Sequence, residues 1–95
     1  MENKKTITTD DLELIHFMCK NYYGSDYLSK EAINNLNNKK PNEYTLDDLS
    51  LIKLLCEEFA WYNIDSEGEQ DFWDLWKKID DIHEKKTEEF WNHGK

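Results

Sequence analysis

Two similar stretches of this chain decide its fold: Thr8–Tyr23, which reads TTDDLELIHFMCKNYY, and Thr45–Ala60, which reads TLDDLSLIKLLCEEFA. They begin 37 residues apart, and seven of their sixteen positions are identical. Each begins with Thr and has Asp three residues later, a near variant of the capping box that opens a helix. An internal duplication explains the match and predicts two related helical hairpins. The alternative is coincidence, since unrelated amphipathic helices can share several Leu and Asp positions.

The first half of the chain predicts two helices of unequal length. One runs from Thr8 to about Tyr23 and is stopped by Gly24. A shorter helix begins with Ser29 as its cap and fades before Pro41, because the intervening Asn residues are weak helix formers. The residues expected to face the core are Leu12, Ile15, Cys19, Tyr22, Tyr23, Ala32, Ile33 and Leu36.

The second half predicts two longer helices. The third helix runs from Thr45 to about Tyr62. Ser66 and Glu69 form a capping-box pattern that introduces a fourth helix from about Glu67 to Asn92. The predicted inward residues are Leu49, Ile52, Cys56 and Phe59 on the third helix, and Phe72, Leu75, Trp76, Ile79, Ile82, His83 and Phe90 on the fourth.

These patterns predict an all-α protein, because no stretch alternates with the period of two that a strand requires. We expect residues 1–95 to form a single domain, built as a four-helix bundle or as two stacked αα-hairpins. The expected parts are a flexible arm (1–7), a first hairpin (8–40), a second hairpin (45–92) and a frayed tail (93–95).

Composition narrows the function classes. The net charge is −9, and the excess lies in residues 43–75, where ten acidic residues face the single Lys53. All twelve basic residues are Lys, so the chain lacks the planar fork of Arg that suits phosphate and base contacts. No run approaches the roughly 20 apolar residues of a membrane span. We therefore expect an intracellular, cytoplasmic protein that binds neither nucleic acid nor membranes directly.

The residues that could carry chemistry do not assemble into a catalytic or metal-binding pattern. His16 and Cys19 are one helical turn apart, which is a zinc-ligand spacing, but the repeat has Lys53 in place of the His. Cys19 and Cys56 occupy matching apolar positions, where buried free thiols are expected rather than a disulfide. We predict no enzyme activity, no cofactor and no metal site.

The acidic segment is the clearest sign of a binding surface. Glu67, Asp71 and Asp74 follow each other at i, i+4 and i+7, which would align three carboxylates on one helical face. Trp61 and Trp73 project away from the predicted core, and Trp beside carboxylates is typical of binding hot spots. The alternative is that these acids cap helices or solvate a face. The predicted partner-binding residues are Asp47, Asp48, Glu57, Glu58, Trp61, Asp65, Glu67, Glu69, Asp71, Trp73 and Asp74.

The sequence thus favours a small acidic binding protein that occludes a basic protein surface, most often one that handles nucleic acid. Inhibitors from phages and mobile elements, including anti-CRISPR and anti-restriction proteins that mimic nucleic acid, share this composition. Two other classes fit as well. One is an immunity protein that neutralises a toxin, and the other is a homodimeric module joined through Leu14, Phe17, Leu51 and Leu54, a second apolar side of the first and third helices.

Overall fold

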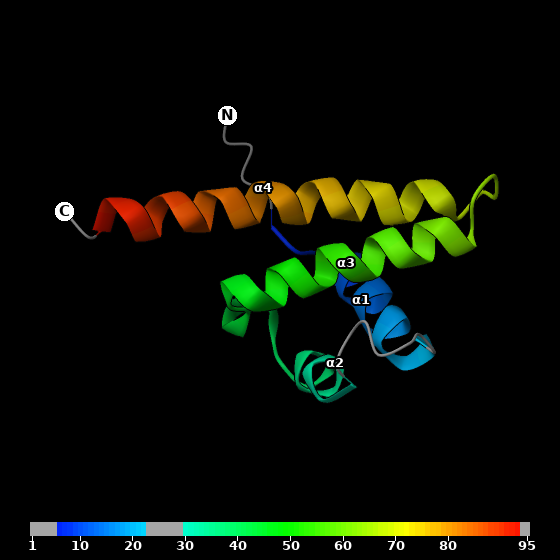
Figure 1. The fold of residues 1–95 in the computed structure, drawn as a ribbon, viewed down its shortest axis with the longest axis horizontal. Coiled ribbons are helices and arrows are strands. Elements are labelled where there is room, and N and C mark those ends of the chain that lie inside the picture. The colour runs from blue at the N-terminus through cyan, green and yellow to red at the C-terminus, as the bar shows by residue number, and fades with distance from the viewer. Residues whose placement is uncertain (1–5, 23–29, 94–95) are drawn as a thin grey trace.

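The structure is a computed structural model that describes residues 6–22 and 30–93, with side chains through residue 89. The prediction of an all-α fold is confirmed: every regular element in the described residues is helical (Figure 1). The elements are α1 (Thr9–Asn21), α2 (Lys30–Asn37), a short 3-10 turn η1 (Pro41–Glu43), α3 (Leu46–Tyr62) and α4 (Glu69–His93).

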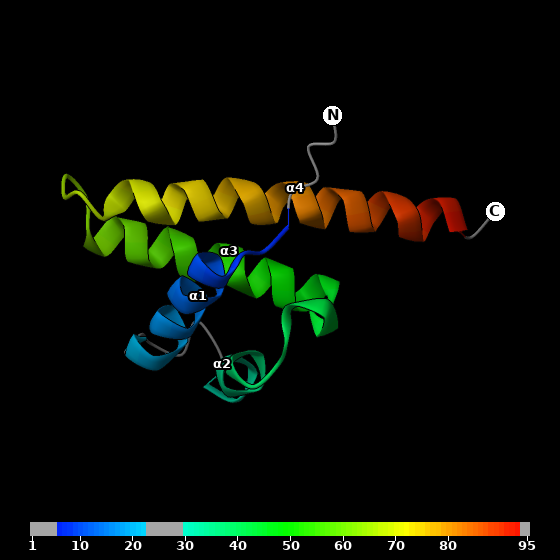
Figure 2. The same cartoon turned by 180° about the vertical axis from the view of Figure 1, so that it is seen from behind.

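The helices form a small bundle around α3. The helix α4 folds back antiparallel to α3 and packs along its length, while α1 packs against both α2 and α3 (Figures 1 and 2). The helix α1 runs across α3 rather than alongside it, so α3 lies between α4 and the α1/α2 pair. This arrangement explains why α3 is apolar on two sides: both sides are covered by neighbouring helices.

The second hairpin is longer on one arm than on the other. With a rise of about 1.5 Å per residue, the 17 residues of α3 span about 25 Å and the 25 residues of α4 about 37 Å. The carboxyl end of α4 therefore extends past the beginning of α3, as Figure 1 shows. Since α2 has only eight residues, the α1/α2 and α3/α4 pairs differ in size although their sequences partly repeat.

The repeated sequence is reproduced as a repeated helix cap. The backbone angles of Thr8 are φ −88° and ψ 174°, and those of Thr45 are φ −92° and ψ 176°. In each copy the Thr hydroxyl accepts a hydrogen bond from the Asp backbone N–H, at 3.2 Å and 3.1 Å. The Asp carboxylate accepts one in return from the Thr N–H, at 2.9 Å in both copies. The predicted capping boxes are confirmed, and each satisfies two donors that a helix start leaves unpaired.

Both cap carboxylates also bind a lysine from another part of the chain. Lys78 of α4 donates to Asp11 at 2.6 Å, and Lys39, which follows α2, donates to Asp48 at 2.6 Å. Burial alone would raise the pKa of each carboxyl, but the hydrogen bonds from the lysine and the Thr cap outweigh it and lower the pKa below 3.8. Each box therefore fixes a helix start and also ties that helix to a second element.

The core is built from most of the predicted stripes with some additions; Leu12 and Ala32, which were also predicted to face it, are only partly buried and lie outside it. Ile15 and Ile52, which occupy matching positions of the repeat, are both fully buried. Met18 and Leu55 are also fully buried, although they do not belong to the predicted inward stripes. They are buried because α1 and α3 each pack against more than one neighbouring helix. The remaining buried apolar residues are Ile33, Leu36, Tyr44, Leu49, Cys56, Phe59, Ala60, Phe72, Leu75 and Ile79.

The predicted start of α4 is wrong in its details. The hydroxyl of Ser66 donates to the carbonyl of Asn63 at 2.6 Å instead of capping the helix, which begins at Glu69. The Glu69 carboxylate accepts from the N–H of Asp65 at 3.0 Å, and Asp65 has a positive φ of 67°. Asp tolerates this left-handed conformation better than most residues, so the chain turns tightly here before the helix starts.

Other predictions lie outside the described residues. They are the inward position of Tyr23, the stop at Gly24, the cap at Ser29, and the orientations of the side chains of Phe90 and Trp91. Among the described helices, none combines the length and the apolar character that a membrane crossing requires.

Candidate protein-binding groove

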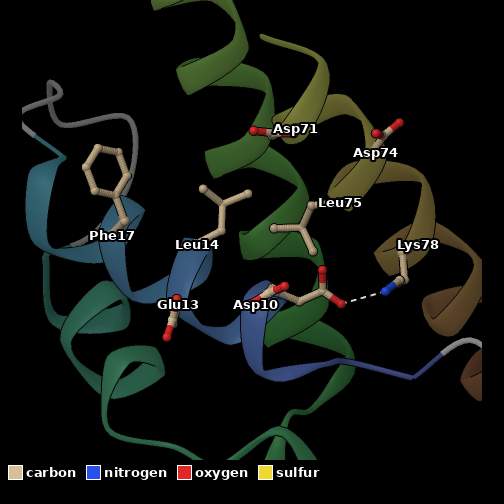
Figure 3. A pocket seen from close by; sticks show the side chains of 9 residues that line it. Asp10, Glu13, Leu14, Phe17, Asp71, Asp74, Leu75 and Lys78 are labelled. Atoms are coloured by element: carbon tan, nitrogen blue, oxygen red, sulfur yellow. Dashed lines mark hydrogen bonds and ion pairs between the residues drawn. The ribbon is translucent and has the colours of Figure 1, made fainter. Parts of the chain in front are cut away.

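A groove of about 550 Å³ lies between α1 and the first half of α4 (Figure 3). Its walls combine acidic and apolar side chains from the two helices. The lining residues are Asp10, Asp11, Glu13, Leu14 and Phe17 from α1, and Asp71, Asp74, Leu75 and Lys78 from α4.

Apolar side chains lie inside the groove, and several of its acids lie on the rim. Figure 3 shows Leu14 and Leu75 directed toward each other across the gap, with the ion pair of Lys78 at one end and Phe17 toward the other. In the same view Asp71 points toward the gap, whereas Glu13 and Asp74 point outward from the two walls. The groove thus combines apolar side chains with carboxylates in similar measure.

Helical spacing places these residues on two facing stripes. Asp10, Leu14 and Phe17 follow each other at i, i+4 and i+7 on α1, so they share one face of that helix. Asp71, Leu75 and Lys78 have the same spacing on α4. The pairing of Asp11 with Lys78 at 2.6 Å holds the two stripes in register.

Negative charge dominates this surface. Among the described residues, five carboxylates line the groove and Lys78, which is bound to Asp11, is the one ammonium group that lines it. Asp74 accepts one hydrogen bond from Gln70 at 2.9 Å. The carboxylates of Asp10 and Glu13 are exposed and form no hydrogen bond or ion pair with the described part of the chain. A cluster of exposed like charges of this kind attracts and orients a positively charged partner.

A different arrangement, which we call the polar seam, follows the α3/α4 contact on another side of α4. It consists of three contacts, each about one helical turn from the last: Ser50 Oγ to His83 Nε2 at 3.3 Å, Lys53 Nζ to Asp80 Oδ1 at 2.9 Å, and Trp76 Nε1 to Glu57 Oε2 at 3.0 Å. The ammonium group of Lys53 also lies 5.5 Å from the centre of the Trp76 ring. The charges of the polar seam are therefore largely matched within the chain.

The Ser50–His83 contact has the spacing that nucleophilic catalysis can use. Both residues lie within helices, where the backbone N–H groups bond to carbonyls one turn earlier. Among the described residues, these helices consequently place no free backbone N–H groups beside the pair that could stabilise an oxyanion. We interpret it as one contact of the polar seam.

The two cysteines are free thiols. Burial raises the pKa of Cys19 to about 11, and burial together with the nearby Glu57 charge raises the pKa of Cys56 to about 12. At neutral pH both are protonated and poorly nucleophilic. Within the described residues, no group of three or more His, Cys, Asp or Glu side chains is placed to hold a metal ion.

The structure divides the predicted binding residues between several surfaces. Asp71 and Asp74 line the groove, whereas Glu57, Glu69 and Trp73 lie on the side of the polar seam. On a helix, Asp71 and Trp73 project about 200° apart and so cannot share a face. The others lie on the outside of α3 (Asp47, Glu58 and Trp61), in the turn before α4 (Asp65 and Glu67), or at the α3 cap (Asp48).

Several of the predicted residues make contacts within the fold. Asp48 is only 9% exposed, because its carboxylate is held by Thr45 and Lys39. Glu69 accepts the indole N–H of Trp73 at 3.0 Å, and Trp73 packs against the core and edge-on to Trp76. The expected row of Glu67, Asp71 and Asp74 does not form as a helical face, since Glu67 precedes the first residue of α4.

The residues that sequence reasoning missed come mainly from α1. Asp10 and Glu13 lie in the first 42 residues, where acidic and basic residues are equal in number, so charge counting passed over them. Leu14 and Phe17 were predicted only as part of a homodimer interface, not as part of an acidic groove. The i, i+4, i+7 spacing of Asp10, Leu14 and Phe17 is a local signal of a shared face. That this face meets α4 is a tertiary fact, which no local signal carries.

Comparisons of the chain with protein-family models, with curated proteins and with solved structures found no match. The interpretation of the groove therefore rests on its own geometry and charge.

Proposed function

We propose that this protein is a small acidic binding protein whose α1/α4 groove docks on a basic surface of a protein that handles nucleic acid. The mechanism is occlusion: the bound protein covers a surface that would otherwise meet a phosphate backbone. The observation that carries the proposal is the groove itself, where five carboxylates accompany apolar side chains and, in the part of the chain that the structure describes, only Lys78 opposes them. The fitting class is the inhibitor of phages and mobile elements, including anti-CRISPR and anti-restriction proteins.

The charge of the whole molecule supports the same assignment. A net charge of −9 repels nucleic acid and attracts proteins that bind it. Charge complementarity at an interface acts mainly on the rate of association, which it can raise by one to several orders of magnitude at low salt. A small protein with this charge can therefore compete with a nucleic acid for a cationic channel.

The other acidic surfaces of the molecule are less suited to docking. Glu57 and Glu69 accept hydrogen bonds from Trp76 and Trp73, so moving them toward a partner would leave two half-buried indole N–H groups unsatisfied. Asp48 is held in the α3 cap. The groove carboxylates of Asp10 and Glu13 have no such internal task.

A toxin-neutralising immunity protein would use the same kind of acidic surface, and only the partner distinguishes it from the first class. The homodimeric module is less supported. Three of the four residues assigned to its interface, Leu14, Leu51 and Leu54, are half-buried and pack against the core. Phe17 alone of that set is exposed.

The test compares two triple variants that change the net charge equally. The groove variant carries Glu13→Gln, Asp71→Asn and Asp74→Asn. The control variant carries Glu84→Gln, Glu88→Gln and Glu89→Gln, three exposed acids toward the other end of α4. Both should remain helical by circular dichroism.

The measurement starts from the immobilised full chain, which captures its partner from a native-host lysate and releases it with salt. The purified partner is then bound to each variant by surface plasmon resonance. We expect the groove variant to associate at least about tenfold more slowly and the control to change little. A nucleic acid should displace the bound protein. Equal rates for the two variants would refute the groove, and a cognate toxin as the captured partner would favour the immunity protein.

A further inference from the structure

The groove continues at one end into an exposed aromatic pair. Phe17 of α1 is 49% exposed and Tyr62 of α3 is 65% exposed, although both are large apolar side chains. Both rings contact Phe59 edge-on, with centroid distances of 6.0 Å and 6.1 Å. Phe59 is buried and packs in turn on Phe72 at 5.7 Å. We call Phe17 and Tyr62 the aromatic end; both rings rest on Phe59, which belongs to the core.

An exposed aromatic surface that is supported by the core is suited to binding. Aromatic side chains lose little conformational entropy when they are covered, and they dominate binding hot spots. Phe17 belongs to the aromatic end and also lines the groove, so the apolar and acidic surfaces are continuous. A partner that covers one of them meets the other.

The spacing along α1 sets a distance between the apolar and the acidic contacts. Leu14 and Asp10 lie one and two turns before Phe17 on the same face, about 5 Å and 10 Å away along the helix axis. An α-helix from a partner that places an apolar side chain on Phe17 and Tyr62 would carry its next residues on that face at the same two intervals. The first interval reaches Leu14, which a further apolar side chain would cover, and the second reaches Asp10, where a cation would meet the rim of the groove.

Self-association through this surface is disfavoured by charge. A two-fold symmetric pair of chains would bring the same groove toward its copy, with five carboxylates and one lysine on each side. Like charges placed opposite each other across an interface are strongly unfavourable. A basic partner carries the opposite charge, so the same carboxylates attract it.

From this geometry we propose that the groove and the aromatic end together receive an amphipathic basic helix of the partner, with an apolar anchor on Phe17 and Tyr62 and with Lys or Arg along the groove rim. The inference rests on the proposed function and adds to it that the partner surface is apolar as well as cationic. A flat, purely polar cationic surface would not use the aromatic end.

The test uses two peptide probes and the full chain. The first probe has Lys and Leu at amphipathic helical spacing over about four turns, and the second replaces every Leu by Ser without changing the charge. Binding is measured by fluorescence anisotropy for the wild type, Phe17→Ala, Tyr62→Ala and Trp61→Ala. Trp61 is the matched control, since it is 70% exposed but projects about 100° away from Tyr62.

We expect the wild type to bind the Lys/Leu peptide at least about tenfold more tightly than the Lys/Ser peptide, with most of that difference lost in Tyr62→Ala and in Phe17→Ala. Trp61→Ala should bind both peptides as the wild type does. Tyr62→Ala keeps the test valid if Phe17→Ala destabilises the fold, because Tyr62 is more exposed and lies at the last residue of α3.

Three outcomes overturn the inference: equal binding of the two peptides, an equal loss in Trp61→Ala, or a wild-type dimer in sedimentation that Tyr62→Ala dissociates. The groove variant Glu13→Gln, Asp71→Asn, Asp74→Asn separates this failure from that of the proposed function. If this variant weakens the binding of both peptides equally while the aromatic variants change nothing, the acidic groove is supported and the apolar anchor is refuted. If it binds both peptides like the wild type, the proposed function falls as well.

Discussion

Replacing Asp48 by Ala should destabilise the protein far more than the same change at its neighbour Asp47. The two residues are adjacent in the first turn of α3 and carry the same charge. Asp48 is 9% exposed and accepts hydrogen bonds from Thr45 and Lys39, whereas Asp47 is exposed. Any effect of charge on the helix dipole is common to both variants, so their difference isolates the buried contacts.

The magnitude follows from what each contact loses. Removing a capping interaction costs about 1 kcal/mol. A hydrogen bond to a charged group contributes about 1.5–3 kcal/mol to stability. The Lys39 side chain is 33% exposed, so water solvates its ammonium group when the carboxylate is removed. We therefore assign about 1 kcal/mol to the loss of the Lys39–Asp48 pair. The sum is about 2 kcal/mol, against about 0.5 kcal/mol for Asp47→Ala. For a domain of this size, 2 kcal/mol lowers Tm by about 8–16 °C.

Thermal and urea unfolding followed by circular dichroism measure both variants. A double-mutant cycle with Lys39→Met and Asp48→Asn should give a coupling energy of about 1 kcal/mol for the ion pair. The reasoning fails if Asp48→Ala and Asp47→Ala unfold at the same temperature, because the carboxylate would then have no buried role.

The pH dependence gives a second test of the same carboxylate. The pKa of Asp48 in the folded protein is lower than 3.8, its value in the unfolded chain. A depressed pKa contributes stability that is fully present above the unfolded value and is lost as the pH falls through the folded value. The stability gap between the wild type and Asp48→Asn should therefore be constant from neutral pH to about 4 and close below that. A gap that instead closes between pH 7 and 5 would exclude this origin.

Three further results are expected. Cys56 and Cys19, with pKa values of about 12 and 11, should react slowly with a thiol reagent at pH 8 in the native protein and rapidly in denaturant; fast native labelling would contradict their burial. Trp73→Ala should lower the free energy of unfolding by about 2 kcal/mol in denaturant titrations, because the ring packs against the core rather than standing free as its sequence position predicted. Lys53→Met should cost about 1 kcal/mol, and adding Asp80→Asn should recover part of it, which a double-mutant cycle measures.

The helix starts show how far local sequence reasoning reaches. The caps at Thr8 and Thr45 were predictable, because a capping box is made by residues three apart and needs nothing else. Ser66 and Glu69 have the same spacing, yet their side chains bond to Asn63 and Asp65 of the preceding turn. The Ser66/Glu69 pattern correctly predicted that a helix begins nearby. The tight turn before α4 places Asn63 and Asp65 within reach, so the two side chains bond to these residues instead of to each other's backbone.

The candidate site was less predictable than the fold. Charge counted along the chain assigned the acidic surface to residues 43–75, but folding uses several of those acids internally. It also brings Asp10 and Glu13, from a segment with no net charge, beside Asp71 and Asp74. A net charge averaged over a sequence window cannot register which acids are paired and which face each other across a groove.

The repeat itself explains why the apolar surface is left uncovered on α1. Phe17 aligns with Leu54 of α3, 37 residues later. Each is followed two residues on by a Cys, Cys19 in α1 and Cys56 in α3. The helix α3 lies between α4 and the α1/α2 pair, so seven of its residues are buried and Leu54 is half-buried against the core. The helix α1 lies at the edge of the bundle, buries only Ile15 and Met18, and leaves Phe17 half exposed. A helix with an apolar face on two sides is stable in the middle of a bundle, and at the edge its second face is available to a partner. The same helical pattern, used twice, thus supplies the centre of the core in one copy and one wall of the candidate binding groove in the other.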